Sequence, residues 1–367
     1  MKVPSIQLFN PEGFDAAPIL RFSYEECICL KHQRGLLIVM EMNRRALYNS
    51  LRMNWVLDPA LEVEAWQVED YRSIPLDQLF ERLEDRDIRL DKPSFVAFSE
   101  PFDNPEDLTH ILLHDADIGR KLQDQVYLIV FELWRRLLPE KLSISILCDE
   151  IDYQIHLYDQ GAVSSNEGIA DTLANLQVVL DENTDEGADS KQVFKCINSG
   201  CANDLESFLH DFISEKIDAA DYSYAAELVE GFGSYLLNVK WVDLLRARLV
   251  ALSNPDEANK MVRKLTNSKN STPDLEFNLE MLSFLVSVGD RETFEQVARQ
   301  TMQLLKVEDD FQALLSFAAD FYHRLDCEEI EESLLKILKQ RETFDASKNF
   351  NVKDPHFTLF SNILNKR

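Results

Sequence analysis

Five acid–base side chains lie close together near the middle of the chain: Asp149, Glu150, Asp152, His156 and Asp159. Carboxylates at the end of a strand can act as a proton donor and a proton acceptor if burial moves their pKa values apart. The cluster therefore suggests an enzyme of unspecified reaction, with an acidic active site within residues 1–160. The simpler alternative is an acidic turn at the surface, which a chain rich in acids is expected to have.

The apolar run SISILC at 143–148, which ends in Asp149 and Glu150, resembles the strand of nucleotide hydrolases whose acids position magnesium and water. That mechanism also needs a phosphate-binding loop of the form G-x-x-x-x-G-K-[ST], and the sequence contains none. The patterns G-x-S-x-G, G-x-G-x-x-G and H-E-x-x-H are absent too. We therefore predict no cofactor, and we interpret residues 149–152 as a hairpin turn.

A second candidate site consists of His110 and His114, which are four residues apart and share one face of any helix formed there. With Asp115 or Asp117 they could bind zinc or iron. However, Ile111 stands where a zinc-protease helix has its glutamate. A pair of surface or partly buried histidines is the alternative that the sequence favours.

The composition limits the classes of partner. The chain has 367 residues, 65 acids and 38 bases, for a formal net charge of -27. Such a charge repels nucleic acids and anionic membranes and favours a basic protein partner, although solubility alone also explains it. Neither a secretory signal nor a membrane-spanning run is visible, and the six cysteines are unevenly spaced. We therefore predict a reduced, cytoplasmic protein.

The first 160 residues predict a mixed α/β or α+β domain. Runs with the composition of strands occur at residues 19–30, 35–41, 61–68, 94–99, 142–148 and 153–158. Amphipathic helices are expected at 75–83 and 118–138. Residues 161–203 form a junction, with a helix over 169–180 and an acidic loop over 181–189.

A repeated pattern begins near residue 204. Helix-start signals recur at Asp221, Asn254, Asp290 and Asp326, with gaps of 33, 36 and 36 residues. Apolar residues follow mostly at offsets of 4, 7, 8 and 11, which lie on one helical face. A period of this size is typical of stacked helical hairpins. We predict an all-helical repeat domain over 204–367, with a capping helix at 355–364.

Two segments, AADYSYAAELVEGF (219–232) and VGDRETFEQVARQTM (288–302), resemble the second helix of a tetratricopeptide repeat. The resemblance extends over residues 204–341. It departs from the family on the first helix, where the family's glycine or alanine is matched only by Ala318. It implies an α-solenoid whose concave face binds peptides or helices.

These observations favour protein–protein recognition, as an adaptor, scaffold or chaperone-like protein, over the enzyme hypothesis. An aromatic-lined surface on the repeats would take a peptide or helix from the partner. The candidate partner-binding residues are Tyr222, Tyr224, Trp241 and Tyr322. Ordinary packing in the core is the alternative role for these four side chains. The sequence does not define an oligomeric state.

Overall fold

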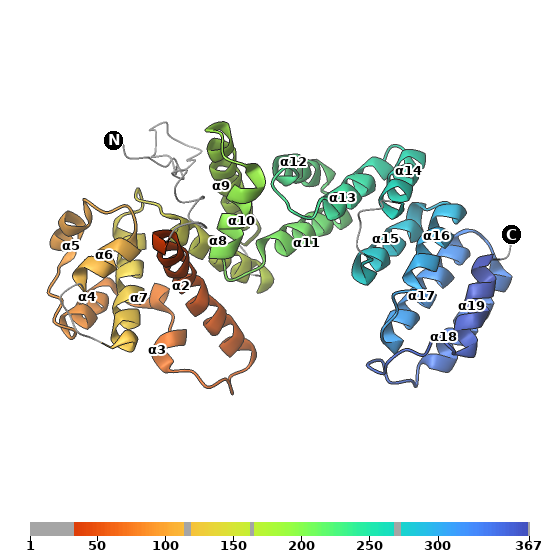
Figure 1. Ribbon diagram of the computed structural model, residues 1–367, viewed down its shortest axis with the longest axis horizontal. Coiled ribbons are helices and arrows are strands. Elements are labelled where there is room, and N and C mark those ends of the chain that lie inside the picture. Colours follow the sequence, from red (N-terminus) through yellow and green to blue (C-terminus); the bar gives the residue numbers. More distant parts are fainter. Residues whose placement is uncertain (1–32, 114–118, 162–164, 268–272, 366–367) are drawn as a thin grey trace. The chain divides into compact units, whose positions relative to one another are not determined.

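A computed structural model describes residues 33–113, 119–161, 165–267 and 273–365 (Figure 1). Within these ranges every regular element is a helix, and the β pairing is limited to an isolated bridge between Val307 and Asn349. The chain divides into two compact units. The first comprises residues 1–209 with 234–237, and the second comprises residues 210–233 with 238–367.

The prediction of an α/β or α+β domain in the first half is wrong. Residues 35–41 lie within α2 (Gln33–Leu57), and residues 94–99 lie within α5 (Lys92–Ser99). Helix α8 (Ile144–Asp159) contains the second strand of the expected hairpin and all but the first two residues of the first strand. Of the run 61–68, only the end is regular, as the short α3 (Ala65–Val68). The alternating run 19–30 lies outside the described residues.

The physical reason for this error is most evident in α8. Its first six residues, Ile144 to Asp149, are all buried, so the apolar run has no polar side and looks like a buried strand. The start of the helix is nevertheless encoded locally, because the Ser143 hydroxyl accepts a hydrogen bond from the Ile146 amide. Residues 149–152 continue this helix instead of forming a turn.

The apolar core of the first unit is centred on helix α7. The prediction of a helix at 118–138 is confirmed by α7 (Arg120–Leu137), whose residues 126–134 are all buried. The preceding elements are η1 (Tyr71–Ser73), α4 (Leu76–Glu84), α5 and α6 (Pro105–Leu112). Apolar side chains from these elements, including Tyr71, Leu79, Phe95 and Leu108, join the α7 core. This core is the support on which the side chains of η1 are positioned.

Three helices follow α8 in chain order: α9 (Ser165–Asp185), α10 (Ser190–Gly200) and α11 (Leu205–Asp218). The predicted helix at 169–180 lies within α9, which also continues through the first half of the acidic segment 181–189. The residues after α10 form a short connection to α11, and they lie against α8 through hydrogen bonds described below.

The second unit is a series of paired helices. After α12 (Tyr222–Phe232) come α13 (Val239–Ala251), α14 (Pro255–Thr266), α15 (Leu275–Val288), α16 (Arg291–Thr301), α17 (Glu308–Arg324), α18 (Glu328–Arg341) and α19 (Pro355–Asn365). Helix α13 packs against α14, α15 against α16, and α17 against α18. In addition α15 packs against both α13 and α17, and α16 packs against α14 (Figure 1). The prediction of helical hairpins is confirmed at this level.

Three of the four predicted helix starts are confirmed. Asp221, Asn254 and Asp290 are the N-cap residues of α12, α14 and α16. The N-cap of α18 is Cys327, one residue later than expected, because Asp326 has a left-handed φ of 54°. The predicted capping helix at 355–364 is α19.

Polar side chains of α14 join its hairpin to the next one, α15–α16. Asn259 on α14 donates hydrogen bonds to the carbonyls of Pro255 and Val288, at 2.8 and 3.0 Å, and accepts one from the Asp290 amide at 2.9 Å. Arg263, one turn further along α14, donates to Thr293 at 2.6 Å. These bonds reach the turn between α15 and α16. They therefore hold the α15–α16 hairpin against α14 and also provide hydrogen-bond partners for the backbone of that turn.

We expect Asn259→Ala to lower the free energy of unfolding by about 1–3 kcal/mol, because buried backbone groups of the α15–α16 turn lose their partner. Asn259 is 5 % exposed. The matched control is Asn267→Ala, at an exposed position where the side chain accepts a bond from Gln296, with an expected loss below about 0.5 kcal/mol. Urea unfolding followed by far-UV circular dichroism measures both. Equal losses in the two variants would contradict the role given to Asn259.

Candidate functional site

The first unit contains a pocket with an empty volume of about 430 Å³, which includes space open to solvent. Helix α2 lines it with side chains on one helical face, and α8 lines the opposite side in the same way, while η1 adds Arg72. We call it the α2–α8 pocket. The α2 residues are Arg45, Asn49, Arg52, Met53 and Val56. The α8 residues are Asp149, Asp152, Tyr153 and His156.

Asp149 is the more deeply buried of the two acids that line the pocket. Its side chain is 2 % exposed and accepts bonds from Nε of Arg45 at 2.6 Å, Nη2 of Arg72 at 2.6 Å and Nδ2 of Asn49 at 3.1 Å. Burial alone would raise the pKa of Asp149, but the charges of Arg45 and Arg72 outweigh it and hold that pKa well below its usual range. Asp149 is therefore a fixed anion.

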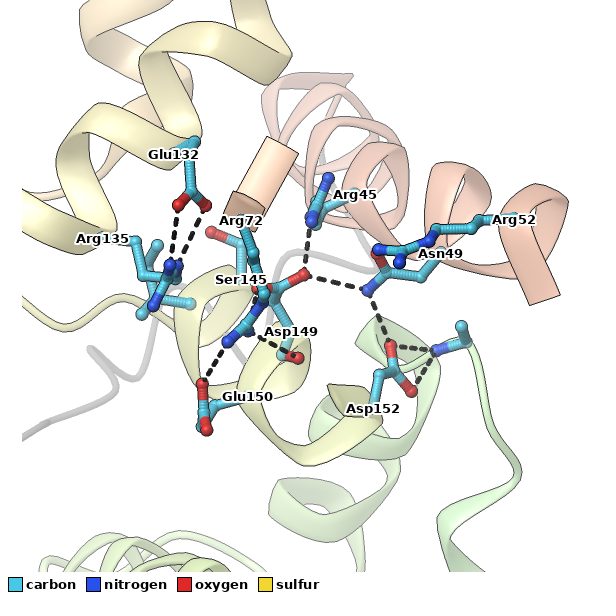
Figure 2. Close-up of polar contacts among 12 residues, drawn as sticks. Arg45, Asn49, Arg52, Arg72, Glu132, Arg135, Ser145, Asp149, Glu150 and Asp152 are labelled. Atoms are coloured by element: carbon cyan, nitrogen blue, oxygen red, sulfur yellow. Dashed lines mark hydrogen bonds and ion pairs between the residues drawn. The ribbon is translucent and has the colours of Figure 1, made fainter. Parts of the chain in front are cut away.

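Asp152, one turn further along α8, has a different role. Its carboxylate accepts the backbone amides of Ala202, at 2.8 Å, and Asn203, at 3.0 Å, together with the side-chain amide of Asn203 at 2.9 Å. Burial raises the pKa of Asp152 despite these bonds, which oppose the shift. Asn49 also donates to Asp152, at 3.2 Å, so it bridges the two buried acids, as Figure 2 shows.

The position of Arg72 is set from α7. Arg136 donates to the carbonyls of Tyr71 and Arg72, each at 2.8 Å, and its own guanidinium is paired with the buried Glu132. This arrangement fixes η1 against the core, from which Arg72 reaches Asp149 and, at 3.0 Å, Glu150. The Arg72 guanidinium also lies 3.9 Å from the centre of the Tyr153 ring, a cation–π contact.

The outer part of the pocket is less constrained. Arg52 pairs with Asp70 at 2.8 Å, and both side chains are partly exposed, at 35 % and 41 %. His156 lies with a ring nitrogen 3.0 Å from the amide nitrogen of Gln160. Met53 and Val56 supply an apolar wall on the α2 side.

The four predicted catalytic candidates thus share one helix, and three of them, Asp149, Asp152 and His156, line one pocket. Glu150 lies beside it, bound to Arg72 and, at 2.8 Å, to Gln154. The pKa values of Asp149 and Asp152 are shifted in opposite directions, and both carboxylates are also bound by neighbouring groups of the fold. Acid–base catalysis at these residues stays a prediction. In the part of the chain that the structure describes, no group of three or more His, Cys, Asp or Glu side chains is arranged to hold a metal ion.

The two histidines proposed as metal ligands are only half described. His110 is exposed near the end of α6, while His114 and its neighbours Asp115 and Asp117 lie outside the described residues. The metal hypothesis at these positions remains a prediction.

The four aromatic candidates differ in exposure. Tyr222, at the start of α12, is 41 % exposed, and Tyr224 is partly buried against Phe212. Trp241 is partly buried and contacts the rings of His210 and Phe277 edge to face. Tyr322 is fully buried, and its hydroxyl donates to Glu295 at 3.0 Å. Of the four, Tyr222 is the most exposed.

Sequence reasoning missed the α2 side of the pocket. The sequence predicts a strand over residues 35–41 of α2 and no element over residues 42–57, which contain Arg45 and the other pocket residues of this helix. The signal that was available is spacing, because positions 45, 49, 52, 53 and 56 form one face of a helix and none of them is acidic. The partner of Arg45 is 104 residues away, and local patterns cannot find such a contact.

Comparisons with protein-family models, with curated proteins and with solved structures found no match to this chain. Among the described residues, no helix combines the length and the apolar composition needed to cross a membrane.

We expect Asp149→Asn to lower the free energy of unfolding by about 3–5 kcal/mol at pH 7, because it leaves Arg45 and Arg72 buried without their countercharge. The folded pKa of Asp149 lies below the unfolded value of about 3.9. The contribution of its carboxylate is therefore full above that value and is lost as the pH falls through the folded pKa. The gap between wild type and variant should narrow below about pH 4, as measured by urea unfolding at several pH values.

The control for this experiment is Glu150→Gln. Glu150 also pairs with Arg72, but its side chain is 38 % exposed, so the expected loss is below about 1 kcal/mol. A loss for Asp149→Asn no larger than for Glu150→Gln, or a gap that does not change with pH, would show that the buried ion pairs do not stabilise the fold.

Proposed function

We propose that this protein recognises another protein, and that its second unit is a tetratricopeptide-like α-solenoid that binds a peptide or helix of its partner. The observation that carries the proposal is the succession of three packed hairpins, α13–α14, α15–α16 and α17–α18, in which α15 packs against the first helices on both sides. Stacked hairpins present extended surfaces that many repeat proteins use for binding.

The contacts between hairpins support a pre-organised surface. Phe294 of α16 and Phe321 of α17 stack with ring centres 3.8 Å apart, and Arg324 of α17 donates to the Val286 carbonyl of α15 at 2.6 Å. A surface held by such contacts loses little conformational entropy when a partner binds, which favours affinity.

Charge favours a basic partner. The chain carries a net charge of -27, and highly exposed acids on the second unit include Asp211, Asp218 and Glu292. Acids of this kind increase the rate of encounter with a basic segment and discriminate against acidic competitors. The proposed compartment is the cytoplasm, which agrees with the free thiols of Cys148, Cys201 and Cys327.

Affinity capture with the full chain from native lysate, quantified by mass spectrometry, tests this function. We expect basic proteins to be enriched over a bait-free control, and Tyr222→Ala to reduce their recovery about tenfold or more, as loss of a hot-spot aromatic does. The matched control is Phe98→Ala, which removes an exposed aromatic on α5 of the first unit. Enrichment that depends on Phe98 and not on Tyr222, or no enrichment at all, would contradict recognition by the repeats.

A further inference from the structure

The end of α2 differs in charge from the rest of the chain. Residues 43–57 contain Arg44, Arg45 and Arg52 and no acid, in a protein whose acids outnumber its bases by 65 to 38. Arg44 and Arg45 are paired, with Asp124 and Asp149 respectively. Arg52 is the arginine of this stretch that reaches the outer part of the α2–α8 pocket.

Asp149 and Asp152, the acids that line the pocket, do not neutralise the positive charge of Arg52 at the surface. Asp149 and Asp152 are both almost fully buried, and each accepts bonds from at least three donor groups. Asp70, which holds Arg52 from outside the pocket lining, is partly exposed, and so is Arg52. An exposed ion pair of this type is weak, so a carboxylate on an incoming ligand can replace Asp70 as the partner of Arg52.

Exposed apolar side chains adjoin the pocket on α2. Met53 and Val56 line it, Val56 is 50 % exposed, and Leu57, four residues after Met53 and therefore on the same helical face, is 83 % exposed. Contiguous exposed apolar side chains on a folded unit commonly mark a contact surface. The pocket is open to solvent beside these side chains, so an apolar side chain of a ligand can reach Met53 and Val56.

We propose that the α2–α8 pocket binds an acidic, amphipathic segment of a partner protein. One apolar side chain of that segment enters beside Met53 and Val56, and an adjacent carboxylate pairs with Arg52. The segment lies along the exposed residues at the end of α2. A small free anion fits the site less well, because Arg45 and Arg72 are already bound to Asp149 and the apolar surface would stay uncovered.

This site is separate from the one proposed for the second unit, and it selects the opposite charge. Arg52 belongs to the first unit, while Tyr222 belongs to the second. Failure of the capture experiment on Tyr222 therefore leaves this proposal standing, and the reverse is also true.

The probe is a phage-displayed library of random 16-residue peptides, selected on the immobilised full chain. Enriched peptides that compete with one another for binding to the chain share one site. We expect these peptides to combine Leu, Phe or Trp with adjacent Asp or Glu. A synthetic copy of an enriched peptide is then titrated by fluorescence polarisation. Val56→Glu and Arg52→Glu should each weaken its binding about tenfold or more, and added salt should also weaken binding.

Two controls keep the test specific. Val178→Glu adds the same charge at an exposed valine on α9 of the same unit and should change affinity less than about twofold. Arg52→Lys retains the positive charge and should retain most of the binding. Hydrogen exchange of the wild-type chain, with and without the peptide, provides a readout that needs no variant, and protection should appear over residues 45–57 and 149–156.

Several results would overturn the proposal. They are an absence of enriched peptides, enrichment of basic peptides alone, equal weakening by Val178→Glu, and protection from exchange at other helices but not at α2 and α8.

Discussion

The first unit depends on one buried carboxylate that two arginines from distant segments share. Asp149 on α8 is bound by Arg45 of α2 and by Arg72 of η1, each at 2.6 Å, and all three side chains are largely withdrawn from water. Burying these charges is costly, and the cost is offset only when the geometry satisfies every member. Any shift of α2 along α8 would break both the Arg45 bond and the bonds of Asn49. The ion pairs therefore select one register for these helices, which a purely apolar contact does not.

The second unit contains a comparable arrangement near its end. Arg341 of α18 is buried and pairs with Glu308 at 2.6 Å and with Asp354 at 3.0 Å. Glu308 begins α17 and Asp354 directly precedes α19, so one guanidinium joins three segments of the last hairpin and its capping helix. Phe311 stacks against the same guanidinium, with 4.8 Å between Cζ and the ring centre. In both units, buried pairs between arginines and carboxylates join helices from separate segments of the chain.

What could be predicted from the sequence follows from the range of the interactions. Helix α7 and the N-caps at Asn254 and Asp290 were predictable, because periodicity and capping are encoded within a few residues. The strands were wrong because the runs in α2, α5 and α8 are short and apolar, and such runs do not distinguish a buried helix from a buried strand. The sequence indicated the cluster of acids on α8, but it did not indicate that these acids bind arginines and backbone amides of distant segments. Arg45 and Arg72 are 104 and 77 residues away from Asp149, and no local pattern connects them.

The hydrogen bonds and ion pairs that stabilise the α2–α8 pocket also limit the chemistry and the binding that the pocket can support. The buried carboxylates Asp149 and Asp152 already accept bonds from several donors, so any proton transfer there would compete with the contacts that position α2. The same contacts restrain the side chains of the pocket, and a restrained site lowers the entropic cost of binding. A ligand can then gain free energy only from the outer groups, Arg52 and the apolar side chains Met53 and Val56. Recognition by this pocket should therefore depend more on the shape of one apolar side chain and on a single charge than on a network of new hydrogen bonds.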